Sequence, residues 1–399
     1  MLQILTSIVF TSSAIFIGFY LFLLCTGILY LRNRTKRLRT SVSATNELPM
    51  VSMIVPVYNE ALVIQRKLEN LQVLHYPKNR LEAIFVDGGS VDGTVKIIES
   101  TAAAGDFPIR VVQQGYRKGY NAAIADGFAE STGEIICFTG AEVEYEPEAL
   151  LLMIQHFADP KVGSVSGRQR IKNIKEGLSP KLEGAYRGLY DFLREAESYI
   201  DSPFNIQGEI CTARRSICAH LVENQKLSDR GCIDSCLSFQ GKIEGYKSAY
   251  EPNAVFDEFA PSSIHESFNQ QVRRAATMIQ SMMIFKGMIL RRRFGAFGML
   301  IMPGHFLMLV VLPFLFLLAS IGTLAIFILA PLQYPFLIVA IITAILAMLF
   351  SRSVQAFVKT QIVLVVTTLG MLIGIETQKF KRLESTRRQT KVRDLDVER

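Results

Sequence analysis

The sequence predicts an α/β fold, in which a Rossmann-like parallel sheet covered by helices lies between apolar segments long enough to cross a membrane. Short apolar runs rich in β-branched residues alternate with helix patterns from Val51 to Thr139. This alternation is typical of parallel sheets, which bind ligands at the carboxyl ends of their strands. Because long apolar segments occupy both ends of the 399-residue chain, we expect a domain that is anchored in a membrane.

Residues 1–31 are predicted to form a transmembrane helix. No charged residue occurs from Ser7 to Leu31, and about 20 apolar residues span a bilayer as a helix. A cleaved signal peptide is the alternative, but the run is too long, no positive charge precedes it, and no small-residue cleavage site follows. Residues 32–48 form a basic linker. The positive-inside rule places such a linker, and the polar domain after it, in the cytoplasm.

The polar domain begins with strand–helix units. A β-branched run predicts a strand over residues 51–56, and an amphipathic pattern predicts a helix over 61–71. The next strand, 83–86, ends in the turn Asp87–Ser90, and Asp92 is placed to cap the following helix. The remaining predicted elements are strand 109–113, helix 122–131, strand 134–139, a helix ending at 158, strand 162–166, a long helix over 182–200 and a loop through Gly208.

The carboxyl-terminal third is predicted to contact the membrane. Residues 264–293 form an amphipathic surface helix, and residues 294–375 form several membrane segments. Three crossings would leave the basic tail, residues 376–399, outside, although basic segments favour the cytoplasm. We therefore expect Val354–Gly374 to lie in the interface. The alternative is that Phe294–Leu332 folds as a short hairpin around Pro313.

The net charge indicates which binding partners to expect, and the cysteines indicate the redox compartment. The net charge is +7, and the basic clusters lie next to apolar spans, where anionic headgroups attract them. Membrane lipids, and no nucleic acid, are therefore the predicted partners. Six cysteines are scattered along the chain, which fits a reducing compartment. Cys232 and Cys236 are interpreted as small buried residues, because no CxxC pair or nearby histidine completes a zinc site.

Three motifs follow one another in the polar domain: Val55-Pro-Val-Tyr-Asn-Glu60, Val86-Asp-Gly-Gly-Ser-Val-Asp-Gly-Thr94 and Thr132-Gly-Glu-Ile-Ile-Cys-Phe-Thr139. In this order and spacing they resemble family 2 glycosyltransferases of the GT-A fold. The similarity extends over about Pro49 to Leu290. It implies a catalytic GT-A domain over residues 49–263.

The resemblance implies a site for a nucleotide-sugar donor. Glu60 and Asp87 follow strand ends, where two carboxylates can converge on one ligand, and with Pro56 and Tyr58 they would line the nucleoside pocket. A turn residue that binds its own backbone is the alternative for Asp87. Lys118, beside Arg117, would meet the diphosphate. An exposed loop pair is the alternative there, because Tyr120 and Ala125 depart from the usual pattern of the family.

The metal motif departs further from the family. Relatives place Asp-x-Asp after this strand to hold a divalent cation, whereas this chain reads Gly140-Ala-Glu142. Mg²⁺ or Mn²⁺ needs few protein oxygens when phosphates and water supply the others, so Glu142 is the predicted metal ligand, with Glu144 as a helper. A weakened metal site, metal independence and loss of activity are the alternatives.

Two later segments supply the remaining predicted site residues. Asp234–Tyr246 resembles the family segment whose aspartate deprotonates the acceptor hydroxyl, which predicts Asp234 as the general base. Asp229 is the fallback, and a helix cap is the alternative role. Gln270-Gln-Val-Arg-Arg274 resembles the family motif Gln-x-x-Arg-Trp in a chain without tryptophan. Gln270, Arg273 and Arg274 are predicted to bind the donor, since guanidinium groups hold phosphate oxygens.

The predicted function is inverting sugar transfer by a multi-pass protein of the cell membrane with a cytoplasmic catalytic domain, about Glu47 to Arg293. The donor is a GDP- or UDP-sugar, such as GDP-mannose or UDP-glucose, and the acceptor is a lipid-linked or membrane-proximal glycan. A processive polysaccharide synthase is the first alternative. A non-catalytic donor-binding protein with a degraded metal motif is the second. A transporter is disfavoured, because Arg352 and Lys359 lie in a break between spans.

Overall fold

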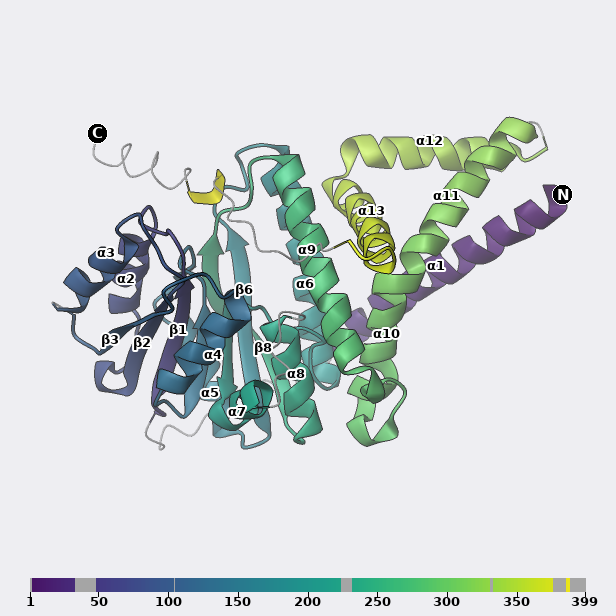
Figure 1. Ribbon diagram of the computed structural model, residues 1–399. Helices are drawn as coiled ribbons and strands as arrows, with labels where there is room; N and C mark the ends of the chain where they lie inside the picture. Colours follow the sequence, from purple (N-terminus) through teal and green to yellow (C-terminus); the bar gives the residue numbers. More distant parts are fainter. Residues whose placement is uncertain are drawn as a thin grey trace.

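The computed structural model describes residues 2–32, 48–103, 105–223, 232–330, 333–375 and 385–387. Most of the basic linker, Asp229 and most of the basic tail lie outside these ranges. A mixed sheet covered by helices forms one half of the molecule, and a group of long helices extends away from it (Figure 1).

The first half of the sheet follows the sequence prediction. Four parallel strands lie in the order β3-β2-β1-β4, and Val51 of β1 pairs with Leu81 of β2 and with Ile135 of β4. The predicted alternation of strands and helices is therefore confirmed. The strands are β1 Val51–Val57, β2 Leu81–Asp87, β3 Ile109–Gln113 and β4 Ile135–Thr139, and the helices are α2 Ile64–Gln72, η2 Lys78–Arg80, α3 Thr94–Ala102 and α4 Tyr120–Glu130.

The second half of the sheet is mixed and contains strands that the sequence did not predict. The order continues as β7-β6-β8-β5, and β7 runs antiparallel to both β4 and β6. The strands are β5 Glu144–Tyr145, β6 Val162–Ile171, β7 Ile210–Arg214 and β8 Lys247–Glu258, and the helices are α5 Ala149–Gln155, η3 His156–Ala158, α6 Leu178–Ile200, α7 Arg215–Glu223 and α8 Ile233–Ile243.

Two hydrophobic cores cover the two faces of the sheet. Successive strand residues point to opposite faces, so Ile54 packs with α4 and α6 while Val55 packs with α2 and α5. The first core continues into the carboxyl-terminal helices and includes Val363 and Leu364. The sheet domain and these helices therefore share one packed interior.

The long helices match the predicted membrane segments in part. Three are long and apolar enough to cross a membrane: Leu2–Ile28, Phe297–Leu329 and Arg352–Leu372. A fourth apolar helix, Pro335–Phe350, is shorter. The bounds are α1 Leu2–Arg32, α9 Ile264–Ile284, η4 Lys286–Met288, η5 Arg292–Phe294, η6 Phe297–Ile301, α10 Met302–Phe306, η7 Leu307–Val311, α11 Leu312–Leu329, α12 Pro335–Phe350 and α13 Arg352–Leu372.

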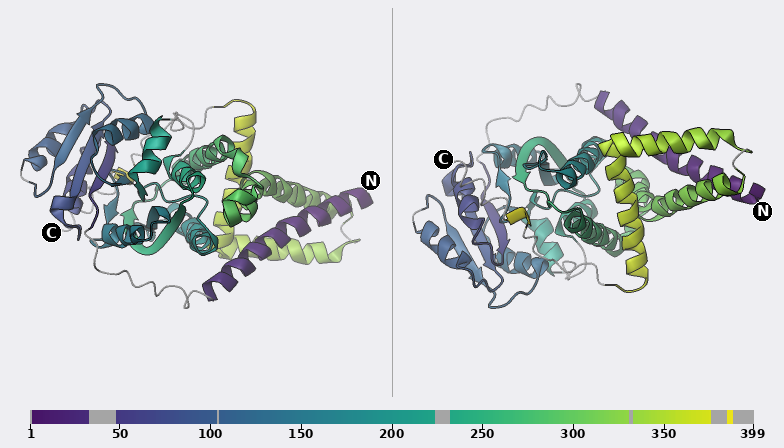
Figure 2. Two further views of the ribbon diagram at one scale, coloured as in Figure 1. Left: turned by 90° about the horizontal axis from the view of Figure 1, so that it is seen from below. Right: turned by 90° about the horizontal axis from the view of Figure 1, so that it is seen from above.

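The helices differ in direction. α1, α11 and α12 extend together away from the sheet, and α13 runs across their base (Figures 1 and 2). α13 packs against α9 and α6. On α9, Met278, Ile279 and Met282 are buried within the chain, whereas Met283 and Ile284 are exposed. The apolar side of α9 therefore contacts protein over much of its length.

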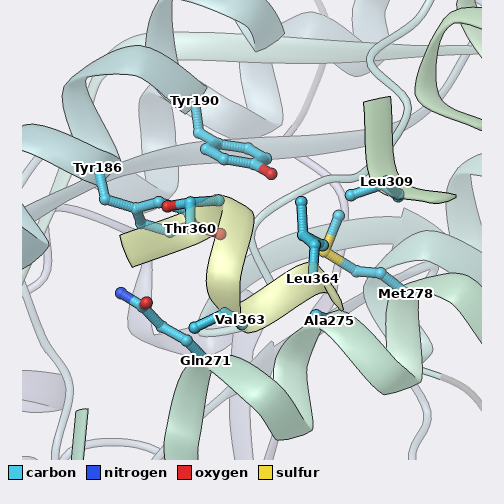
Figure 3. Close-up of a pocket in the computed structure, with 9 residues that line it drawn as sticks. All are labelled: Tyr186, Tyr190, Gln271, Ala275, Met278, Leu309, Thr360, Val363 and Leu364. Atoms are coloured by element: carbon cyan, nitrogen blue, oxygen red, sulfur yellow. The ribbon is translucent and has the colours of Figure 1, made fainter. Parts of the chain in front are cut away.

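A small, mostly apolar pocket marks the junction of α6, α9 and α13. Tyr186, Tyr190, Met278 and Leu364 line it, and the Gln271 side chain lies at one side (Figure 3). A second junction lies nearby, where His305 of α10 contacts Glu197 of α6 with 2.6 Å between Nε2 and Oε1.

Candidate active site

The loops after β1 and β2 hold the first two predicted donor-binding residues. Glu60 follows β1 and is buried, with 6 % of its surface exposed. Its backbone N–H donates to Thr94 Oγ1 over 2.8 Å, and the Asn59 N–H donates to Ser90 Oγ over 2.8 Å. Asn59 adopts a positive φ of 55°, which asparagine tolerates better than most residues. The two loops are thus fixed to each other.

Asp87 ends β2 and is buried in the turn that follows. Its Oδ2 accepts hydrogen bonds from the backbone N–H groups of Gly89 and Ser90, both over 3.0 Å. This is the turn geometry that the sequence offered as the alternative role. It fixes the carboxylate beside the Glu60 loop, so the contact is compatible with a binding role as well.

The remaining predicted donor residues of this region lie near the surface. The Arg117 guanidinium stacks 4.8 Å from the centre of the Tyr58 ring, and Pro56, in β1, is half-buried. The Lys118 ammonium lies 3.4 Å from Asp126 Oδ2, on the helix that follows. Arg117 therefore reaches the Glu60 loop, whereas the described contacts of Lys118 are with its own neighbourhood.

Glu142 lies in a turn after β4 that a buried lysine supports. Lys67 of α2 donates to Thr139 Oγ1 over 2.8 Å and to the Val143 carbonyl over 2.9 Å. Burial lowers the pKa of Lys67 to about 8, although Glu142 and other acidic groups oppose this shift. Glu144, the predicted helper, is instead paired with Arg66 and Lys172, at 3.2 and 2.7 Å.

Glu209, which the sequence analysis missed, lies beside Glu142. A Cβ atom added to Gly140 would lie 2.9 Å from Glu209 Oε2 and 3.0 Å from Glu142 Oε2. Burial, together with the charges of Glu258 and Glu142, raises the pKa of Glu209 to about 8. The signal in the sequence was a single carboxylate after Gly208, at the start of an apolar run, which by itself indicates nothing specific.

The predicted base, Asp234, lies beside Gly208, the residue that precedes Glu209. Its Oδ2 is 2.9 Å from the point where a Cβ on Gly208 would lie. Its Oδ1 accepts the Ser235 N–H over 2.6 Å and also contacts Cys232. Burial raises the pKa of Asp234, although these hydrogen bonds oppose the shift. A raised pKa suits a carboxylate that takes up a proton.

Tyr120, a departure from the family pattern, also belongs to this group. It begins α4, where the chain turns in through Gly119 at a φ of 104°. Burial raises its pKa, and the carboxylates of Glu209, Asp234 and Glu142 add to the effect. Its hydroxyl therefore stays protonated and can donate a hydrogen bond near these carboxylates.

The three residues predicted on α9 have different surroundings. Gln270 is buried. Burial lowers the pKa of Arg273 to about 10, as does the charge of Arg274, while Glu209 and Glu142 oppose the shift. Arg273 is therefore within electrostatic reach of Glu209 and Glu142. The Arg274 guanidinium instead lies 3.2 Å from Glu183 Oε1 of α6, which is a contact within the scaffold.

The described part of the tail reaches the same site. Arg387 is buried, with 3 % exposed, and donates through Nε and NH2 to Glu60 at 2.9 and 2.8 Å. The Nη2 atom of Arg387 also donates to Glu142 Oε1 over 3.2 Å. Burial alone would raise the pKa of Glu142, but the charges of Arg387, Lys67 and Arg274, with a backbone hydrogen bond, together lower that pKa. These contacts join Glu60 and Glu142, predicted for donor and metal, in one site.

The side chains around Gly140 are carboxylates, which are the type of ligand that hard divalent cations prefer. No group of three or more histidine, cysteine, aspartate or glutamate side chains suited to a metal occurs within the described residues. Glu142 and Glu209 nevertheless offer two carboxylates that approach one point. Mg²⁺ and Mn²⁺ accept such sites when a diphosphate and water provide the remaining oxygens.

Comparison with known proteins identifies what this domain is similar to. The family model described as glycosyl transferase family 2 matches residues 52–221. The chain is 37% identical over 135 residues to a probable glycosyltransferase, YdaM, of Bacillus subtilis, covering 33% of this chain and 32% of the relative. It is 25% identical over 231 residues to the poly-beta-1,6-N-acetyl-D-glucosamine synthase of Staphylococcus aureus, covering 58% and 55%. The matches thus span a third to about half of these relatives.

One solved structure shares the fold over almost the whole chain. It is the mannosyltransferase PcManGT from Pyrobaculum calidifontis, in complex with GDP-Man and Mn²⁺. The TM-score is 0.73 at 23% identity, and the match covers 93% of this chain and 100% of the other. The predicted GT-A architecture is thereby confirmed. Residues 52–221 thus match the family 2 glycosyltransferase model, and the chain has the GT-A fold.

Proposed function

We propose that the protein is an inverting glycosyltransferase, which moves a sugar from a GDP- or UDP-sugar to a hydroxyl of a lipid-linked or membrane-proximal acceptor. One observation carries the proposal: Asp234 approaches Gly208, while the next residue, Glu209, approaches Gly140 together with Glu142. A base on one side and a diphosphate site on the other is the arrangement that inverting transfer needs.

Each predicted residue has a role in this mechanism. Glu60 and Asp87 bind the nucleoside beside Pro56 and Tyr58. Asp234 accepts the proton of the acceptor hydroxyl as that oxygen attacks the anomeric carbon, and the bond from this carbon to the diphosphate breaks.

Two cationic groups, Arg273 and Lys118, are proposed to act on the diphosphate. Arg273 holds oxygens of the departing group, since a charged guanidinium binds phosphate in a bidentate way. Gln270 and Arg274 lie on the same helix as Arg273, and Lys118 reaches the diphosphate only if its pair with Asp126 opens.

A divalent cation, Mg²⁺ or Mn²⁺, is proposed as the cofactor. Glu142 would hold it, and when bound it would supply positive charge to the leaving diphosphate. Lys67 maintains the turn that carries Glu142, through its contacts with Thr139 and Val143.

We further propose that the catalytic domain and the tail share the cytoplasmic side of the cell membrane. Arg387 binds Glu60, so the chain between residue 293 and residue 385 must cross an even number of times. Crossings by α11 and α12, with α13 in the interface, satisfy this condition and agree with the direction of α13 (Figure 2). α12 has 16 residues, or about 24 Å of helix, which is short for a core of about 30 Å.

The test is nucleoside diphosphate release by the detergent-purified chain. A panel of GDP- and UDP-sugars, including GDP-mannose and UDP-glucose, is supplied with lipid acceptors and either Mn²⁺ or a chelator. We expect release from one donor, its loss on chelation, and its loss in Asp234→Asn. The matched control is Asp257→Asn, because Asp257 pairs with Arg170 at the surface, 2.6 Å away. Donor binding without release in the wild-type chain would contradict the proposal.

A processive polysaccharide synthase is the second candidate, favoured by the 231-residue match to the poly-beta-1,6-N-acetyl-D-glucosamine synthase. The length of the product distinguishes the two. A single added sugar per acceptor supports the leading proposal, and a ladder of long products supports the second.

A further inference from the structure

We propose that Glu209 is the second carboxylate of the metal site and replaces the side chain that Gly140 lacks. The inference rests on the proposed function, because it assigns one more residue to the same cation. It starts from the space above Gly140. Oxygens of Glu209 and Glu142 both lie within 3.0 Å of the point where a side chain at residue 140 would begin.

The surroundings of Glu209 favour a bound cation over a structural role. Its backbone carbonyl accepts the Tyr145 hydroxyl, but its carboxylate makes no hydrogen bond or ion pair within the described residues. Two carboxylates this close repel each other unless a cation lies between them. The other oxygen of Glu142, Oε1, accepts from the Arg387 guanidinium over 3.2 Å, and Oε2 is the oxygen that approaches Gly140.

An aspartate at residue 140 would require the end of the Glu209 side chain to move. The Cβ atom of such an aspartate would lie 2.9 Å from Glu209 Oε2, closer than side-chain carbons come to a neighbour. The two positions therefore compete for one space. A chain can place a carboxylate there from residue 140 or from residue 209, but not from both without a rearrangement.

Mn²⁺ binding tests this assignment without depending on turnover. The loss of the free Mn²⁺ signal in electron paramagnetic resonance is measured with the full-length protein in detergent and saturating GDP or UDP. We expect Glu209→Gln to weaken Mn²⁺ binding about 10- to 100-fold. Glu144→Gln is the control, since Glu144 pairs with Arg66 and Lys172. Thermal unfolding and nucleotide binding without metal check that each variant is folded.

The double variant Gly140→Asp with Glu209→Ala completes the test. It frees the space and supplies a carboxylate from residue 140, so Mn²⁺ binding should recover in part. Wild-type affinity in Glu209→Gln would overturn the role of Glu209 alone. A wild-type chain that binds nucleotide but no Mn²⁺ would instead overturn the metal in the proposed function, and this inference with it.

A separate observation supports a second inference, which concerns the tail. We infer that the segment Ser385–Arg387 closes the donor site when no donor is bound. Arg387 forms a bidentate pair with Glu60 and contacts Glu142. Thr386 is buried beside it, and Ser385 contacts Glu266 of α9. The segment is therefore held at several points and is not a passing contact of one long side chain.

Occupation by Arg387 excludes the donor and the cation. A nucleoside that uses Glu60 must replace the two hydrogen bonds from the guanidinium, and a cation on Glu142 would meet its positive charge at close range. Donor and cation therefore bind only to the form in which the segment has left. If the closed form makes up about 90 % of the protein, apparent donor affinity is reduced about tenfold.

Calorimetry with GDP or UDP and Mn²⁺ tests this closure on the full-length protein. Arg387→Ala should bind the nucleotide about tenfold more tightly, and Arg387→Lys should be intermediate, because lysine cannot form the bidentate pair. Arg170→Ala, which removes a surface guanidinium, is the control. Unchanged affinity in Arg387→Ala would overturn the closure, and so would weaker binding, because Arg387 would then be a group that binds the donor.

Discussion

Lys67 offers a sharp test of the electrostatics beneath the site. Its side chain is almost completely buried, with 1 % exposed. The ammonium donates to Thr139 Oγ1 and to the Val143 carbonyl and lies 4.7 Å from the centre of the Tyr145 ring. Lys67→Met keeps the length of the side chain and removes its charge and its donors.

The size of the effect follows from the pKa. Burial lowers the pKa of Lys67 from 10.5 to about 8, which corresponds to about 3 kcal/mol against the charged form. Loss of a donor to the Val143 carbonyl destabilises the variant by about 1–3 kcal/mol. The two effects oppose each other, so at pH 7.5 we expect the variant and the wild type to have similar free energies of unfolding.

The difference between them changes with pH. Because the pKa is lower in the folded chain, the unfolded chain binds more protons between pH 8 and 10.5, and wild-type stability rises with pH across this window. The contribution of Lys67 gains about 2 kcal/mol from pH 7.5 to pH 10, or about 4–8 °C in Tm. Lys67→Met lacks this gain.

Thermal unfolding of both proteins in detergent at pH 7.5, 9 and 10 measures the effect. Taking the difference in Tm between wild type and variant removes the contribution of every other titrating group. We expect the wild type to become more stable relative to the variant as pH rises. A difference that stays constant with pH would refute the reasoning that burial depresses the pKa of Lys67.

Two further predictions concern close approaches of the backbone. Gly167→Ala places a Cβ 2.1 Å from the Ala254 carbonyl oxygen and should destabilise the chain by about 3 kcal/mol in a thermal unfolding assay. The control is Gly188→Ala, because no atom lies within 4 Å of the added Cβ. This variant should be as stable as the wild type or more stable. Gly322→Leu should separate α1 from α11, because a Cβ at Gly322 already lies 2.3 Å from a Val9 methyl group. Protease sensitivity of the detergent-purified chain should rise, and unchanged sensitivity would argue against this packing.

The part of the fold that the sequence predicts is the part with local signals. β1 to β4 are short runs rich in β-branched residues, and β1, β2 and β3 are each followed directly by a helix. β7 and β8 lack such signals. β8 contains Pro252, Asn253 and Asp257, which disfavour strands, and it forms because β6 pairs with it along its length.

The same distinction applies to the site. Motif spacing places Glu60, Asp87 and Glu142 at strand ends, and the structure has Asp87 at the last position of β2 and the two glutamates in a loop and a turn at the same edge of the sheet. Glu209 and Arg387 reach this edge from distant parts of the chain. Their placement depends on β7 lying beside β4 and on the tail folding back. Neither pairing leaves a periodic pattern in the sequence.

The contacts of α9 connect the membrane helices to the donor site. Gln271 and Arg274 both bind Glu183 of α6, at 2.8 and 3.2 Å, while Lys359 of α13 donates to Ser267 of α9 over 2.7 Å. Buried polar networks tolerate a displaced member poorly, because each loss leaves a desolvated partner. A shift of α13 would therefore move α9 as a unit. Arg273 lies on that helix, so the position of the proposed diphosphate ligand depends on how α13 is seated against the sheet domain.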